Sequence, residues 1–152
     1  MIQVLNRQRL HKIHRQAVVV FCNAALLSLD LGDKAVSVVF TGKREMRILN
    51  RRYRGRNEPT DVLSFSYEDT VIDGMPFMGE IIISPEVAFS RAAGYGYRPE
   101  RELRRIIVHG LLHLMGYDHE TDNGVMNLLQ QRLTRRKFFR SDPLLTGAKE
   151  KR

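Results

Sequence analysis

Apolar residues recur at helical spacing in five stretches of the chain. The spacing predicts helices over residues 8–29, 43–53, 85–93 and 99–115, and a last helix that starts between residues 120 and 123 and runs to Phe139. Pro85 and Pro99 suit first helical turns, and Gly116 suits the left-handed turn that often ends a helix. The helix over 99–115 is apolar on most sides from Ile106 onward, so we expect it to be the buried, central helix.

Valine-rich or alternating segments between these helices predict strands over residues 1–7, 35–41, 60–67 and 77–84. Asp73 and Gly74 favour a hairpin turn before the last of them. We find no repeats and no sign of a second domain. The sequence therefore predicts one α+β domain over residues 1–140, with a small mixed sheet of about four strands packed by about five helices. Residues 141–152 are predicted to be a frayed tail.

Composition favours a cytoplasmic protein with no membrane partner. No apolar run is long enough to span a bilayer, and the N-terminus lacks the apolar core of a secretory signal. The single cysteine, Cys22, cannot form an intramolecular disulfide, which fits a reducing compartment.

The charge is strongly positive and unevenly distributed. The formal net charge is +8, and residues 43–56 alone carry seven basic side chains against one acidic one. One such run is often only a solvated helix face, but together with the global excess it favours a polyanionic partner, above all nucleic acid. Arg47, Arg51, Arg52 and Arg56 are the candidate RNA-binding residues of this segment.

Three histidines lie within eleven residues, at a spacing that can close around one metal ion. His109 and His113 are four apart, so they project from the same face of the predicted helix. After the turn at Gly116 the chain can double back and present His119 to the same point. Three neutral imidazoles without a fourth protein ligand describe an open, catalytic type of site. The alternative is metal-free, with two core histidines and one surface histidine.

The order of ligands matches the zinc motif of metzincin proteases except at one position. Where those enzymes carry a glutamate as general base, this chain has Gly110, which argues against peptide hydrolysis. A purely structural zinc is also disfavoured, because such sites usually have four ligands and prefer cysteine. Asp118 is a candidate to orient an imidazole from behind, or else to cap the last helix.

Three blocks of the chain resemble the bacterial endoribonuclease YbeY family, between about Leu49 and Leu133. They are residues 50–65 (NRRYRGRNEPTDVLSF), residues 79–84 (GEIIIS) and residues 108–119 (VHGLLHLMGYDH). The chain departs from the family pattern at Glu80, at Ser66, and at Tyr95–Tyr97, where the family often has a histidine. None of these departures removes a metal ligand.

The resemblance implies one zinc ion on His109, His113 and His119, with nickel or another divalent metal also possible. It implies that Arg54 is the activity-linked arginine, and that the enzyme cleaves single-stranded RNA. It further implies a role in 16S rRNA 3′-end maturation and quality control of the small ribosomal subunit. By chemistry alone, an open metal position can activate water, and a guanidinium can neutralise charge on a phosphoryl transition state.

Other readings remain open from sequence alone. One is a non-enzymatic rRNA-binding assembly factor whose metal only braces the fold, and another is a metal-dependent hydrolase of a different substrate. The attacking group is either water or the RNA 2′-hydroxyl, and the absence of a carboxylate base near the ligands favours water.

Overall fold

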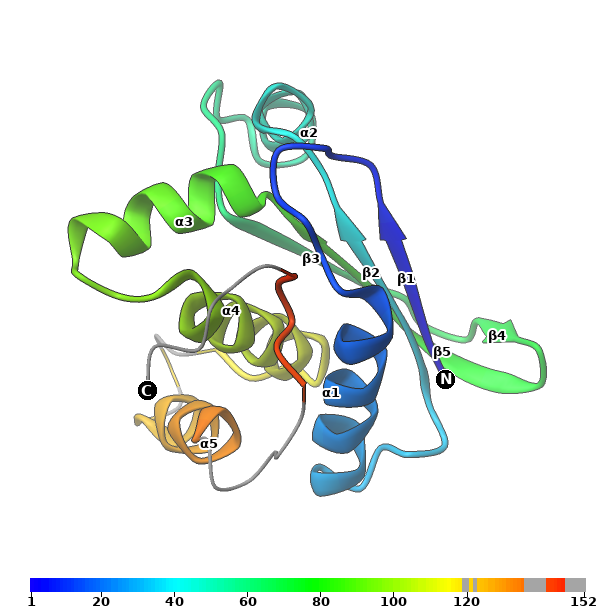
Figure 1. The fold of residues 1–152 in the computed structure, drawn as a ribbon. Helices are drawn as coiled ribbons and strands as arrows, with labels where there is room; N and C mark the ends of the chain where they lie inside the picture. The colour runs from blue at the N-terminus through cyan, green and yellow to red at the C-terminus, as the bar shows by residue number, and fades with distance from the viewer. Residues whose placement is uncertain (119–120, 122, 136–141, 147–152) are drawn as a thin grey trace.

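A mixed sheet forms the centre of the molecule, seen here in a computed structural model that describes residues 1–118, 121, 123–135 and 142–146 (Figure 1). The strands are β1 (Ile2–Asn6), β2 (Ala35–Phe40), β3 (Val62–Ser66), β4 (Val71–Ile72) and β5 (Met75–Ile83). The helices are α1 (Arg15–Ser28), α2 (Lys43–Arg54), α3 (Pro85–Gly94), α4 (Pro99–Leu114) and α5 (Val125–Thr134). This arrangement confirms the predicted α+β fold with a small mixed sheet and five helices.

The strand order is β1-β2-β5-β3, with β4 paired to the start of β5. β1, β2 and β5 run parallel, while β3 and β4 run antiparallel to β5. Every residue of β2 is buried, as expected for a parallel strand covered on both faces. β3 is the last strand of this path, so the β3–β5 pair lies at one side of the sheet.

Helices cover both faces of the sheet. On one face α1 and α4 pack against the side chains of Val38, Ile81 and Ile83 in the main core. On the other face Met46 of α2 packs with Val39, Leu63 and Ile82 in a smaller core. The sheet therefore separates the basic helix α2 from the histidine-bearing helix α4, as Figure 1 shows.

The last helix starts at Val125, slightly later than predicted, and two other helix boundaries differ more, for local reasons. α1 begins at Arg15 instead of near residue 8, because the His14 Nδ1 atom accepts the Ala17 N–H at 2.9 Å and caps the helix there. α5 ends at Thr134, well before Phe139, since Arg135 has an extended backbone (φ −64°, ψ 131°). The residues between Arg135 and Asp142 lie outside the described part of the chain.

The expectation of a frayed C-terminal tail is wrong for residues 142–146. Leu144 is fully buried, and the Glu100 carboxylate accepts the N–H groups of Leu144 and Leu145 at 2.7 and 3.1 Å. The segment also pairs with the start of the chain, through His14 N–H to the Leu144 carbonyl and Thr146 N–H to the Lys12 carbonyl. These contacts tie the C-terminal segment to α4 and to the residues before α1.

None of the helices within the described residues is both long and apolar enough to cross a bilayer.

Candidate metal centre

Helix α4 carries the two central histidines, and its sequence explains why it is a helix at this place. Pro99 occupies its first turn, with Glu100 and Glu102 at the positive end of the helix dipole. Leu103, Ile107 and Leu111 are completely buried against the sheet and α1, which fixes the rotation of the helix. The remaining face carries His109 and His113.

The two imidazoles converge on one point. The His109 Nε2 and His113 Nε2 atoms lie 3.0 Å apart, with the ring planes at 77° to each other. Two nitrogens that are each about 2.0–2.1 Å from a tetrahedral zinc would be roughly 3.3 Å apart. The separation and the chemistry of this pair therefore fit two ligands of a single metal ion.

Gln130 of α5 holds His109 from behind. Its Oε1 atom lies 3.0 Å from His109 Nδ1, and the side chain is only 9% exposed. Since an amide oxygen only accepts, Nδ1 carries the proton and Nε2 keeps its lone pair for a ligand. Sequence reasoning missed this residue. The signal was a glutamine on the buried side of α5, in line with Met126 and Leu133.

The third expected ligand, His119, lies outside the described residues. Within the described residues, no group of three or more histidine, cysteine or acidic side chains is placed to hold a metal. The turn that leads to His119 is described: Gly116 has φ +93°, and the Tyr117 N–H donates to the Leu112 carbonyl at 3.1 Å. The left-handed turn at Gly116 is thus confirmed, and the part played by His119 stays a prediction.

Gly110 has a packing reason to be glycine. A Cβ atom at this position would lie 2.7 Å from Cγ2 of Ile81 on β5, so α4 approaches the sheet as closely as the backbone allows. A glutamate here would point into the sheet, away from the histidine face. The position that carries the general base in metzincin proteases therefore serves helix–sheet packing in this chain.

Asp118 is exposed, and its carbonyl accepts the Thr121 N–H at 3.1 Å. Its expected support of an imidazole stays a prediction. For His109 that place is taken by Gln130.

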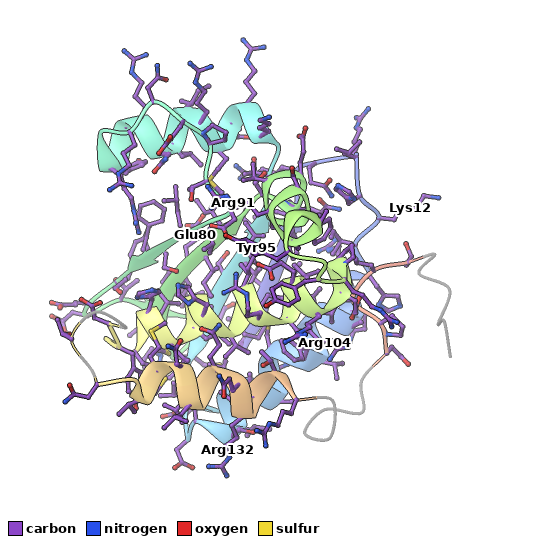
Figure 2. The ribbon with its side chains drawn as sticks, turned by 90° about the vertical axis from the view of Figure 1, so that its left-hand side faces the viewer. Lys12, Glu80, Arg91, Tyr95, Arg104 and Arg132 are labelled. Carbon is purple, nitrogen blue, oxygen red and sulfur yellow. The ribbon has the colours of Figure 1, made fainter. Side chains whose placement is uncertain are left out.

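Arg54 is the last residue of α2, and its side chain is exposed, as are those of Arg47, Arg51, Arg52 and Arg56. Figure 2 shows long, nitrogen-tipped side chains standing out from α2 on the side away from the sheet. Arg47 Nε donates to Asn57 Oδ1 at 3.1 Å, and the Arg52 guanidinium lies 5.5 Å from the Tyr53 ring centre. α2 thus presents a basic surface whose charges have few partners among the described residues.

The ends of α2 and α4 meet the same stretch of the β3–β5 pair from opposite faces. The Tyr53 ring contacts Phe65 of β3 at 5.1 Å, and Leu114 of α4 lies against Gly79 of β5. In the register of the two strands Phe65 pairs with Glu80, and Ser66 pairs with Gly79. Arg54 and the imidazole pair are therefore on opposite faces of the sheet, near its β3 side.

Arg105 and Glu102 lie on the same face of α4 as His109, towards the start of the helix. Arg105 donates to both Glu102 oxygens, at 3.0 Å from Nε and 2.5 Å from Nη2. This hydrogen-bonded pairing raises the pKa of Arg105 above its usual value. Cys22, by contrast, lies in the core, where burial raises its pKa to about 12 and keeps the thiol protonated.

The model of the endoribonuclease YbeY family matches residues 2–137. The chain belongs to this family. An endoribonuclease YbeY of Thermodesulfovibrio yellowstonii is 37% identical over 149 residues, covering 87% of this chain and 94% of the relative. One of Geobacillus thermodenitrificans is 48% identical over 95 residues, covering 57% of this chain and 61% of that one.

The fold is also found in a solved structure of similar extent. The solution structure of TM1509 from Thermotoga maritima has a TM-score of 0.64 and 26% sequence identity, and covers 91% of this chain and 89% of that chain. The family membership confirms the resemblance found in the sequence and the expected enzyme class, endoribonuclease.

Proposed function

We propose that this endoribonuclease cleaves single-stranded RNA at one zinc ion held by His109, His113 and His119. The observation that carries the proposal is the convergence of the His109 and His113 Nε2 atoms, backed by Gln130 on His109 Nδ1. Nickel or another divalent metal suits the same donor set. A bound divalent ion supplies a Lewis acid for the phosphoryl oxygen and lowers the pKa of water, so that a nucleophile is available at neutral pH.

The residues of the chain supply position and charge. Gln130 fixes the His109 tautomer, and the buried apolar side of α4 fixes the spacing of the two rings. Arg54 is proposed to neutralise charge that develops on the phosphate, because a guanidinium binds phosphoryl oxygens through two parallel hydrogen bonds. RNA that reaches both Arg54 and the imidazoles would pass over the β3 side of the sheet.

The basic surface of α2 is proposed to bind the RNA backbone. Arg47, Arg51, Arg52 and Arg56 are exposed on this helix and the loop after it, where they can contact successive phosphates. The biological substrate is proposed to be ribosomal RNA, at the 3′ end of 16S rRNA in the small subunit. Support for this last step, and for a part in ribosome maturation and quality control, comes from the resemblance of the three sequence blocks. Support for action in the cytoplasm comes from the composition.

The metal centre is tested with three single variants. His113→Ala should lose the bound metal and the cleavage of a single-stranded RNA together. Gln130→Ala should weaken metal binding by about 10- to 100-fold, since removal of a partner behind a ligand typically has this effect. Gln131→Ala, at an exposed position next to it on α5, is the matched control and should change neither. Metal content and chelator competition measure binding, and RNA gels measure cleavage.

Cleavage that persists in His113→Ala and in excess chelator would contradict the metal-centred mechanism. Equal metal affinity in the Gln130→Ala and Gln131→Ala proteins would contradict the role given to Gln130.

A further inference from the structure

A hollow lies beside the histidine face of α4, between α4 and the end of α3. It has a volume of about 360 Å³ and is lined by Asp61, Arg91, Ala92, Tyr95, Tyr97, Glu102 and Arg105. Figure 2 labels Arg91 and Tyr95 above α4. None of these residues belongs to the proposed metal centre, so the hollow needs its own explanation.

Its position relates it to the imidazole pair. Glu102, Arg105 and His109 are separated by three and four residues, so they lie along one face of α4. At 1.5 Å of rise per residue, Arg105 is about 6 Å from His109 along the helix axis. An RNA strand that binds at His109 and runs along α4 towards Pro99 reaches the hollow within roughly two stacked nucleotides of 3.4 Å each.

The charges that line the hollow are already paired. Arg105 donates to both oxygens of the buried Glu102, and Arg91 Nη1 lies 3.3 Å from Asp61 Oδ1. Two guanidinium groups thus face two carboxylates, and the lining has no net charge. Such a hollow does not favour a phosphate, but it offers both hydrogen-bond donors and acceptors to a neutral polar group.

The aromatic side of the hollow is unusually exposed. The Tyr95 and Tyr97 rings are nearly parallel, with 6.2 Å between centres and 27° between planes, and they are 79% and 45% exposed. The Arg101 guanidinium lies 4.8 Å from the centre of the Tyr97 ring. A flat, solvent-facing pair of rings backed by a cation is a surface on which a nucleobase stacks.

We infer that this hollow, the tyrosine subsite, binds one unpaired nucleobase of the RNA next to the cleavage point. The base stacks on the Tyr95–Tyr97 pair, and its polar edge faces Asp61 and Arg91. None of the described residues donates to Asp61 Oδ2, so this oxygen can accept an N–H of the base, while Arg91 can donate to a carbonyl or ring nitrogen. A paired base cannot enter, which makes the subsite a source of the preference for single strands. The inference rests on the proposed action on single-stranded RNA.

Binding of a short RNA, measured without cleavage, tests the subsite. The probe is a fluorescent, single-stranded 2′-O-methyl RNA hexamer, whose anisotropy gives Kd and whose integrity is checked on a gel. Tyr95→Ala and Tyr97→Ala should each raise Kd by about 5- to 150-fold, the range that corresponds to loss of one stacked base. Tyr97→Phe, which keeps the ring, should bind as the unchanged protein does.

Tyr67→Ala is the matched control, because Tyr67 is 46% exposed and lines a different hollow beside the β4–β5 hairpin. It should leave Kd unchanged. A series of hexamers, each with one abasic nucleotide, locates the base that the subsite binds. The hexamer without that base should bind the unchanged protein weakly, and its Kd should not change in Tyr95→Ala. A duplex of the same sequence should be equally insensitive. Thermal melting of each variant checks folding, and since Tyr95 is so exposed, its variant keeps the test valid if Tyr97→Ala is unstable.

Equal Kd values for the Tyr95→Ala, Tyr97→Ala and Tyr67→Ala proteins would overturn the subsite. So would an equal loss of affinity on single-stranded and duplex probes. Failure of the metal mechanism looks different: hexamer binding would still depend on Tyr95, while RNA cleavage would not depend on His113.

Discussion

At the residue scale, one glycine decides how α4 sits on the sheet. A Cβ atom at Gly110 would approach Ile81 to 2.7 Å, whereas a Cβ atom at Gly94, also in a helix, meets nothing within 4 Å. Overpacking of this kind costs about 1–3 kcal/mol, while alanine in a helix is favoured over glycine by up to about 1 kcal/mol. We therefore expect Gly110→Ala to be less stable than Gly94→Ala by about 1–3 kcal/mol in urea unfolding.

The partner of this contact provides a further check. Ile81→Ala removes the side-chain atoms that clash with a Cβ atom at position 110. In that background, Gly110→Ala should lower the free energy of unfolding by less than it does in the unchanged protein. Equal stabilities of the Gly110→Ala and Gly94→Ala proteins would mean that α4 moves away from β5 freely. The histidine face would then not be fixed by the sheet.

Sequence reasoning worked at this scale wherever the partners are close in the chain. The spacing of His109 and His113 predicted that they share a face, and their Nε2 atoms do converge. Gln130 lies twenty-one residues from His109, and its role follows from how α5 packs on α4. Its place in line with Met126 and Leu133 is visible in the sequence, but the packing of α5 on α4 that brings it to His109 is not.

At the element scale, the C-terminal segment is held by the first turn of α4. The Glu100 carboxylate accepts the N–H groups of Leu144 and Leu145 and pairs with Arg104 at 3.1 Å. Hydrogen bonds to a charged group contribute about 1.5–3 kcal/mol. We expect Glu100→Ala to lower the free energy of unfolding by about that amount, and to speed hydrogen exchange at the amides of Leu144 and Leu145.

Glu86→Ala is the control for this prediction. Glu86 lies in the first turn of α3, which also starts with a proline, so its loss removes the same kind of interaction with a helix dipole. If both variants lose stability and hydrogen exchange at Leu144 is unchanged, Glu100 stabilises the protein through the helix dipole and not through the C-terminal segment.

Elements were predicted best where the pattern of burial is local. Four predicted elements agree closely with the structure. They are the strands over 35–41 (β2) and 60–67 (β3) and the helices over 43–53 (α2) and 85–93 (α3). Residues 142–146 were assigned to the frayed tail of residues 141–152 because chain ends are usually poorly ordered unless other parts of the molecule hold them. Their order depends on Glu100 and on the backbone of residues 12–14, which are distant in sequence.

At the scale of the whole molecule, the sequence predicted the amount of charge but not its place relative to the metal centre. A basic segment and a histidine helix are visible in the sequence, yet their positions on opposite faces of the sheet follow from the order of the strands. Because both helices end over the β3–β5 pair, the RNA is expected to extend from one face to the other. Affinity should then depend on phosphate contacts along α2 as well as on the site.

This expectation can be measured as salt dependence. For a single strand, the logarithm of the binding constant falls with the logarithm of salt concentration with a slope of about −0.7 for each neutralised phosphate. The double variant Arg51→Ala/Arg52→Ala should therefore reduce the slope by about 1.4 if each arginine contacts one phosphate. The double variant Lys12→Ala/Arg132→Ala removes the same charge elsewhere on the surface, because Figure 2 labels both residues well away from α2. It should weaken binding slightly and leave the slope unchanged. Equal slopes for the two double variants would mean that RNA senses only the net charge of +8, and that α2 is no backbone-binding surface.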